Sequence, residues 1–161
     1  MKRLLLAALA LFAWTAADAA TTGNNFVTEQ TPNVGVVQFL QGTDSAGTYK
    51  TIYTAGANGS KCYGGYLTSN DSTSHLVTFQ LVRSSVKYGG MAINTGTTLP
   101  GFANGVPPIA FMSASNWPGL PTDNANNPYI LMASGDTLQA TFATSLTSSD
   151  FISAVVICGD F

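Results

Sequence analysis

His75 is the only histidine of this 161-residue chain, so any search for catalytic chemistry begins with it. A catalytic imidazole needs a nucleophile on one side and a carboxylate on the other. No serine lies in the Gly-x-Ser-x-Gly setting that exposes a nucleophile on a sharp turn. His75 stands between a polar segment and an apolar run, so we interpret it as a polar residue at a loop edge.

The acidic residues are few and fall mostly at turn positions, where an Asp carboxylate accepts hydrogen bonds from its own backbone. Turn stabilisation accounts for them without the two acids across a cleft that glycoside hydrolysis requires. One histidine and two distant cysteines fall short of a structural zinc site. Neither Asn70-Asp71 nor Asp123-Asn124 has the acid density of a calcium loop. The sequence therefore predicts no enzyme, no cofactor and no metal.

A proline-rich segment from Thr98 to Pro128 holds the candidates for ligand binding. Proline removes a backbone donor, so we expect a long excursion at one end of the domain rather than a central strand. Four aromatic residues lie in or beside it: Phe102, Phe111, Trp117 and Tyr129. If exposed, they would stack on sugar rings or enter a contact with another subunit. Alternatively, they fold back as a lid over the edge of the domain.

Cys62 and Cys158 are the only cysteines. Cys62 opens one expected strand, and Cys158 closes the last one. In a jelly roll the second and last strands are antiparallel neighbours, which would bring the start of one beside the end of the other. An even number of cysteines in an exported chain suits a disulfide. We predict a Cys62–Cys158 bridge, and two separate buried thiols are the alternative.

The first nineteen residues have the three parts of a bacterial export signal. A basic Lys-Arg pair precedes the apolar run from Leu4 to Trp14, and Ala17 and Ala19 fit the small residues before a cleavage site. The run is shorter than the ~20 apolar residues that span a membrane. We expect cleavage after Ala19, which leaves residues 20–161 as a single domain without a membrane segment. An uncleaved anchor is the alternative.

The composition is that of an all-β domain. Hydrophobic residues make up 45% of the chain, so a core can form, and an aromatic fraction of 11% excludes disorder. Charged residues make up only 9%, and abundant Thr, Ser, Asn and Gly favour strands and turns over a helical bundle. The formal net charge is −2, which argues against a nucleic-acid-binding surface.

Eight or nine short strands with frequent turns are expected. The clearest is Leu76 to Arg83, where Val77, Phe79 and Leu81 share one face. Polar residues alternate with them, facing outward or toward a partner, which is the period of a half-buried strand. The other expected strands cover 34–40, 49–54, 61–68, 86–95, 109–112, 129–132, 137–144 and 151–158. This pattern predicts a two-sheet antiparallel β-sandwich, either jelly-roll or immunoglobulin-like.

Two stretches carry a family resemblance. Thr51 to Asn70 reads TIYTAGANGSKCYGGYLTSN before the strand LVTFQLVR, and PYILMASGDTLQATFATS precedes the closing FISAVVICGDF. Together they resemble a widespread group of small proteins encoded by bacteriophages and prophages. Its members typically read T-x-F-T-A-G-A-N-G-S and end in a hydrophobic strand plus Gly-Asp-aromatic, here Gly159-Asp160-Phe161. The resemblance is weakest across Pro100 to Pro128, and it implies a virion-associated or accessory structural β-sandwich without catalytic residues.

The sequence therefore predicts a non-enzymatic structural or assembly protein of phage or prophage origin, such as a decoration or surface protein of a virion. Low charge suits association with copies of itself or with other structural subunits. The export signal and the cysteines depart from the group's pattern, so we expect an exported (periplasmic or extracellular) or virion-associated protein. The alternative function is a secreted carbohydrate-binding or adhesion module that contacts a glycan through Trp117 and its aromatic neighbours.

Overall fold

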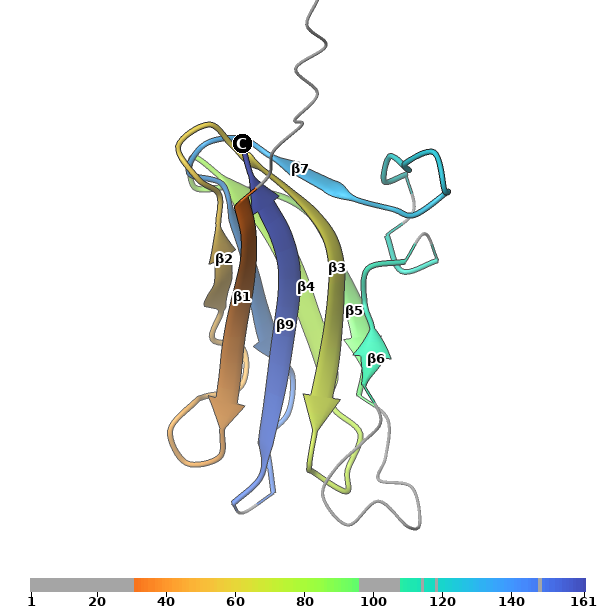
Figure 1. The fold of residues 1–161 in the computed structure, drawn as a ribbon. Coiled ribbons are helices and arrows are strands. Elements are labelled where there is room, and N and C mark those ends of the chain that lie inside the picture. The colour runs from red at the N-terminus through yellow and green to blue at the C-terminus, as the bar shows by residue number, and fades with distance from the viewer. Residues whose placement is uncertain (1–30, 96–107, 114, 118, 148) are drawn as a thin grey trace, which may run out of the picture.

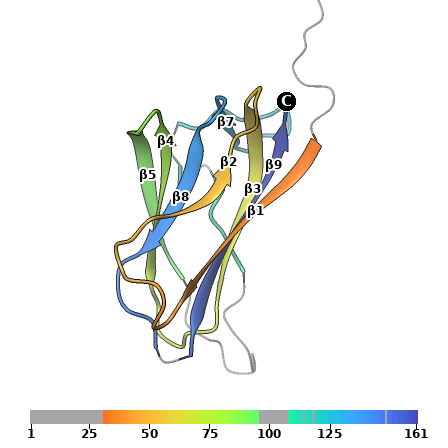
Figure 2. The ribbon, with the colours of Figure 1, turned by 90° about the vertical axis from the view of Figure 1, so that its left-hand side faces the viewer.

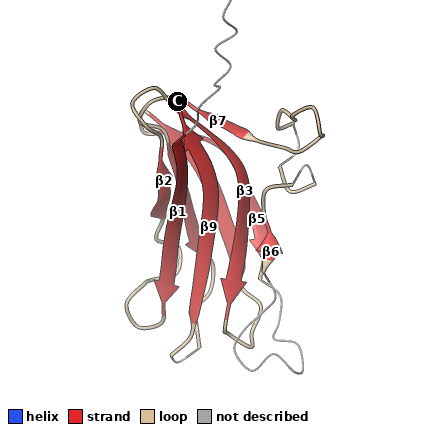
Figure 3. Ribbon diagram, in the orientation of Figure 1, coloured by secondary structure: helices blue, strands red, loops and turns tan. Residues whose placement is uncertain are grey.

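The computed structural model describes residues 31–95, 108–113, 115–117, 119–147 and 149–161, which form nine β-strands (Figures 1 and 3). The strands are β1 (Thr31–Leu40), β2 (Lys50–Thr54), β3 (Ser60–Ser69), β4 (Leu76–Arg83), β5 (Val86–Asn94), β6 (Ile109–Ala110), β7 (Ile130–Met132), β8 (Thr137–Phe142) and β9 (Phe151–Asp160). All the expected strands are present and differ from the prediction only at their ends. Within these ranges no helix is long and apolar enough to cross a membrane.

The strands form two antiparallel sheets packed face to face (Figure 2). The five-stranded sheet has the order β1-β9-β3-β6, with β7 also paired to β3, and the four-stranded sheet has the order β2-β8-β4-β5. Apart from β7, this is the strand order of a jelly roll, so the predicted β-sandwich is confirmed. The last strand, β9, lies between the first and third strands, not beside the second strand as expected.

The core lies between the two sheets, and strand β4 shows how the sequence pattern produces it. Val77 and Phe79 are fully buried, and Leu81 is partly buried against the core, as their spacing predicted. Gln80 points to the other side of the sheet but is also buried, and its side-chain amide NH donates to the side-chain oxygen Oε1 of Gln139 at 2.8 Å across the β4–β8 pair. The side chain that was expected to face solvent or a partner thus bonds its neighbouring strand.

The predicted disulfide joins Cys62 to Cys158 within the five-stranded sheet. The two residues are directly opposed in the β3–β9 pair, and their α-carbons are 3.9 Å apart. Neither side chain is exposed. The bond links two strands whose cysteines are 96 positions apart in the chain.

The described part of the proline-rich excursion packs onto the sandwich beside β3. Strand β6 pairs with β3, and the Phe111 ring that follows it stacks on Phe79 with ring centroids 4.2 Å apart. Gly65 on β3 faces this ring so closely that a Cβ atom there would overlap it. A glycine at this position therefore allows Phe111 to enter the core.

Candidate functional site

Apolar side chains gather on the solvent side of β1, β9 and β3, which we call the outer face and which faces the viewer in Figure 1. Two cross-strand rows make up its apolar part. In the first, Val34 lies opposite Ile157, and in the second, Val36 lies opposite Val155, which lies opposite Tyr66. Val34, Val36 and Tyr66 are 55%, 59% and 37% exposed. Directly opposed side chains on one sheet face lie close enough to form a continuous surface.

The sequences of β1 and β9 explain this surface. Each strand is apolar at successive positions rather than at alternate ones: β1 contains VGVVQFL, and β9 contains FISAVVIC. One set of side chains, such as Phe39 and Val156, enters the core, and the other set remains outside. Strands of this composition are typically buried on both faces. The sequence analysis missed the outer face, although these uninterrupted apolar runs were its signal.

The outer face carries little charge. Among the residues of β1, β9 and β3, only Lys61 and Asp160 are charged. The Lys61 ammonium lies 4.2 Å from the centre of the Tyr129 ring. The Asp160 carboxylate bonds the hydroxyls of Tyr53 and Ser60 at the top of the sandwich. Neither charge therefore falls within the two apolar rows.

The solvent side of the four-stranded sheet has a different character. Thr78 lies opposite Thr141, and Gln80 lies opposite Gln139, so the two central strands present hydroxyl and amide groups. The glutamine pair satisfies part of its hydrogen bonding internally. Leu76 on β4 and Val86 and Tyr88 on β5 are exposed apolar side chains of this sheet. The sheet that contains β1 has two adjacent apolar rows, a surface of the kind that marks interaction sites.

His75 lies in a buried hydrogen-bond network at the lower end of the sandwich. Its Nε2 bonds the Asp71 carboxylate at 2.8 Å, and its Nδ1 bonds the Thr144 hydroxyl at 3.0 Å. The His75 backbone NH donates to the Thr95 hydroxyl at 2.8 Å. Asp71 also accepts hydrogen bonds from the Thr147 backbone NH at 2.8 Å and from its hydroxyl at 3.0 Å. The network thus fastens three chain segments together.

This network contains a hydroxyl, an imidazole and a carboxylate in sequence. Asp71 is fully buried and His75 is 2% exposed, so the network lies inside the domain and links loop segments there. Burial alone would raise the pKa of Asp71, but hydrogen bonds from the backbone of Thr147 and Thr73 outweigh it and lower that pKa to about 2. His75 lies at a loop edge directly before β4, as expected, but its side chain is buried and bonds Asp71 and Thr144.

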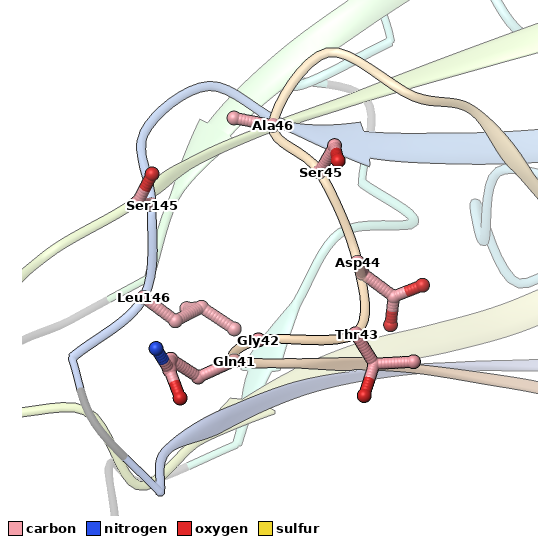
Figure 4. A pocket seen from close by; sticks show the side chains of 8 residues that line it. All are labelled: Gln41, Gly42, Thr43, Asp44, Ser45, Ala46, Ser145 and Leu146. Carbon is pink, nitrogen blue, oxygen red and sulfur yellow. The ribbon is translucent and has the colours of Figure 1, made fainter.

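A pocket of about 340 Å³ opens beside this network, between the β1–β2 loop and the β8–β9 loop (Figure 4). Its lining residues are Gln41, Gly42, Thr43, Asp44, Ser45, Ala46, Ser145 and Leu146. No aromatic ring lines it, and the Asp44 carboxylate is engaged by the Leu40 backbone NH at 2.8 Å and by Lys50 at 3.0 Å. Across the described ranges, no group of three or more His, Cys, Asp or Glu side chains is placed to hold a metal ion.

The four aromatic candidates have different positions. Phe102 lies outside the described residues. Phe111 is fully buried and Trp117 is 9% exposed, so both belong to the core and do not have the exposure that the predicted ligand contact requires. Both side chains belong to the hydrophobic core cluster, where burial removes their apolar surface from water. Tyr129 is half-buried, with Lys61 over its ring. Phe111 and Trp117 thus follow the alternative expectation, in which the aromatic residues fold back over the edge of the domain.

No protein-family model matches the sequence, and no curated protein matches it either. Among solved structures, a chain of the "Cyanophage Pam1 capsid asymmetric unit" is similar to this one. The two chains share 16% sequence identity, and the similarity covers 87% of this chain and 90% of that chain with a TM-score of 0.44. The class that the fold itself defines is a disulfide-linked jelly-roll sandwich with one apolar outer face.

Proposed function

We propose that this chain is a non-enzymatic structural protein of phage or prophage origin, a decoration or surface protein of a virion, which contacts neighbouring subunits through its outer face. The observation that carries the proposal is the pair of uncharged apolar rows built on Val36, Val155 and Ile157. Removing apolar surface from water stabilises a contact by roughly 25 cal/mol per Å². The resemblance of the chain's two long motifs to phage- and prophage-encoded sandwich proteins supports the same role.

We also propose that residues 1–19, which lie outside the described residues, direct export and are then removed. The Cys62–Cys158 disulfide supports this, because such bonds form and persist in oxidising compartments and are rare in the cytosol. An exported chain would join a particle, or another assembly, outside the cytoplasm.

The carbohydrate-binding alternative has less support. It relied on aromatic rings free to stack on a sugar. Phe111 and Trp117 are buried, and the Tyr129 ring is covered on one side by Lys61. The pocket in Figure 4 offers polar groups but no aromatic platform.

The proposal is tested by measuring how much of this chain is present on particles purified by density gradient from the strain that encodes it. Quantitative mass spectrometry should find it in a fixed ratio to the other structural subunits. Val155→Lys, which places a charge within the apolar rows, should reduce that ratio at least tenfold, since burying an unpaired charge is costly.

Thr51→Lys is the matched control, because Thr51 is exposed on β2 of the opposite sheet. This variant should be retained on the particle like the parent. Both variants should have the same melting temperature as the parent. If Val155→Lys disturbs folding, the smaller change Val155→Thr is used in its place. Absence of the chain from purified particles, or equal retention of Val155→Lys and Thr51→Lys, contradicts the proposal.

A further inference from the structure

Strand β1 forms the edge of the five-stranded sheet, and Figure 2 looks onto this edge. In an antiparallel pair, alternate residues direct their NH and C=O toward the neighbouring strand, and the residues between them direct both groups away. The Gln38 carbonyl accepts from Lys50 Nζ at 2.7 Å, and the Leu40 NH donates to the Asp44 carboxylate at 2.8 Å. The even-numbered residues of β1 therefore point away from β9.

Val34 and Val36 belong to this outward-pointing set. Within the described ranges, their NH and C=O groups have no hydrogen-bond partner. Their side chains are 55% and 59% exposed. With respect to the described residues, the edge thus offers two donors and two acceptors without partners on either side of Gly35.

Natural proteins usually block an edge with charge, proline or a covering loop. The lower half of β1 is partly blocked in this way, since Lys50 bonds the Gln38 carbonyl and Asp44 accepts from the Leu40 NH. At the upper end, Pro32 has no NH to offer. None of the described residues protects the stretch between them in these ways.

We propose that β1 of a second copy of this chain pairs antiparallel with this edge, about a two-fold axis at Gly35. Val34 then lies opposite Val36 of the second copy, and Val36 lies opposite its Val34. Four hydrogen bonds then pair the NH and C=O groups of these valines in both copies. Isologous contacts of this kind are self-complementary by symmetry.

The residues that flank the open stretch select this register. Pro32 comes to lie opposite the second copy's Gln38, whose carbonyl already accepts from Lys50, so the missing proline NH leaves no acceptor unpaired. A shift by two residues in one direction sets Val36 opposite Pro32, which lacks a donor. The opposite shift sets Val34 against Gln38, whose acceptor is occupied.

Charge and continuity favour a second copy as the occupant. The open stretch carries no charged side chain, so two copies meet without like charges. The pairing joins the two five-stranded sheets edge to edge and places the two outer faces side by side. The role of the dimer rests on the proposed function, since the dimer would present two outer faces to neighbouring subunits. The dimer contact itself involves only the edge of β1.

The first measurement is the mass in solution, by light scattering over a concentration series, of protein that begins at Ala20. The parent should be a dimer. Val36→Pro removes an NH that β9 does not use, and should raise the dimer dissociation constant by about tenfold or more through the loss of two hydrogen bonds. Val34→Lys, which sets a lysine on the edge of each copy, is a second variant in case the proline disturbs folding. Val86→Lys, at an exposed position on β5 in the opposite sheet, is the control and should remain a dimer.

Amide hydrogen exchange identifies the occupant. The Val34 and Val36 amides should become protected as concentration rises, and mixed Val34→Cys and Val36→Cys proteins should cross-link better than either alone. A parent that stays monomeric at high concentration, or a folded Val36→Pro protein with unchanged dimerisation, overturns the inference. So does a monomer with both amides protected, which would assign residues 20–30 of the same chain to the edge. If the parent is a dimer but its Val155→Lys variant is still retained on particles, only the proposed function is contradicted. If the parent is a monomer but its Val155→Lys variant is lost from particles, only this inference is contradicted.

Discussion

The Asp160 carboxylate on β9 accepts a hydrogen bond from the Tyr53 hydroxyl on β2, and this contact joins the two sheets near the C-terminus. The same carboxylate accepts from the Ser60 hydroxyl at 2.5 Å and from the Asn33 amide at 3.2 Å. The hydrogen bonds from Ser60 and Tyr53 outweigh the effect of burial and lower the pKa of Asp160. Asp160 therefore links β9 to β1, β2 and β3 at the upper end of the sandwich.

Asp160→Asn should lower the free energy of unfolding at pH 7 by about 1–3 kcal/mol, because it removes the charge from three hydrogen bonds. The folded pKa lies below the unfolded value of ~3.9, so the stabilisation is present above that value and is lost as pH falls through the folded pKa. Urea unfolding at pH 7 and pH 3 should show the gap between parent and variant narrowing at the lower pH. Asp150→Asn, at a surface turn, should stay within about 0.5 kcal/mol of the parent; an equal loss there would refute the specific role of Asp160.

The Asp71 network predicts a second acid-sensitive contribution. Because the folded pKa is about 2, the ionised Asp71 stabilises the fold above the unfolded value near 3.9 and loses that effect as pH falls toward 2. A shift of this size corresponds to about 2 kcal/mol. Asp71→Asn should therefore unfold at lower urea than the parent at pH 7, with the difference shrinking below pH 4. A difference that is the same at both pH values would assign the effect to packing instead.

Removing the disulfide should destabilise the domain. A closed loop of about 100 residues is worth up to ~4.7 kcal/mol in the chain-entropy model, and the two cysteines are 96 positions apart. The double variant Cys62→Ala/Cys158→Ala should melt well below the parent, and a reductant should lower the melting temperature of the parent but not of the variant. Free reaction of both thiols with a maleimide in the folded, exported protein would show that the bridge does not form.

Phe79→Ala should cost about 3–5 kcal/mol of stability, as for other buried aromatic residues. Because Phe79 stacks on Phe111, a double-mutant cycle between the two should give a coupling of about 0.5–1.5 kcal/mol. Val86→Ala, at a 55% exposed position, is the control and should change stability little. Additive losses for Phe79 and Phe111 would mean that the excursion does not pack as described.

Export makes a separate prediction. We propose that the exported protein begins at Ala20, since Ala17 and Ala19 occupy the positions that signal peptidase requires. Intact-mass analysis of material from the periplasm or medium should find this N-terminus. Exported protein that retains Met1 would favour the uncleaved anchor.

Several features of the fold follow from local sequence patterns. The alternation of Val77, Phe79 and Leu81 predicted both a strand and its buried face, because side chains on a strand point to opposite sides in turn. Turn residues separated the strands, and several Asp carboxylates cap their own turns, as Asp71 does by accepting from the Thr73 NH at 2.8 Å. The number of short strands was enough to predict a sandwich.

Only the tertiary structure decided how distant strands meet. β9 pairs with both β1 and β3, and this placement alone turns the apolar runs of both strands into an outer face. It also brings Asp160 to Tyr53, while contacts between other distant segments bury His75 and Phe111. Such contacts depend on pairings between residues far apart in the chain, such as Asn33 and Asp160, which are 127 positions apart. Periodicity and turn propensity act over a few neighbouring residues, so they determine which strands form, whereas burial of a shared core determines which strands become neighbours.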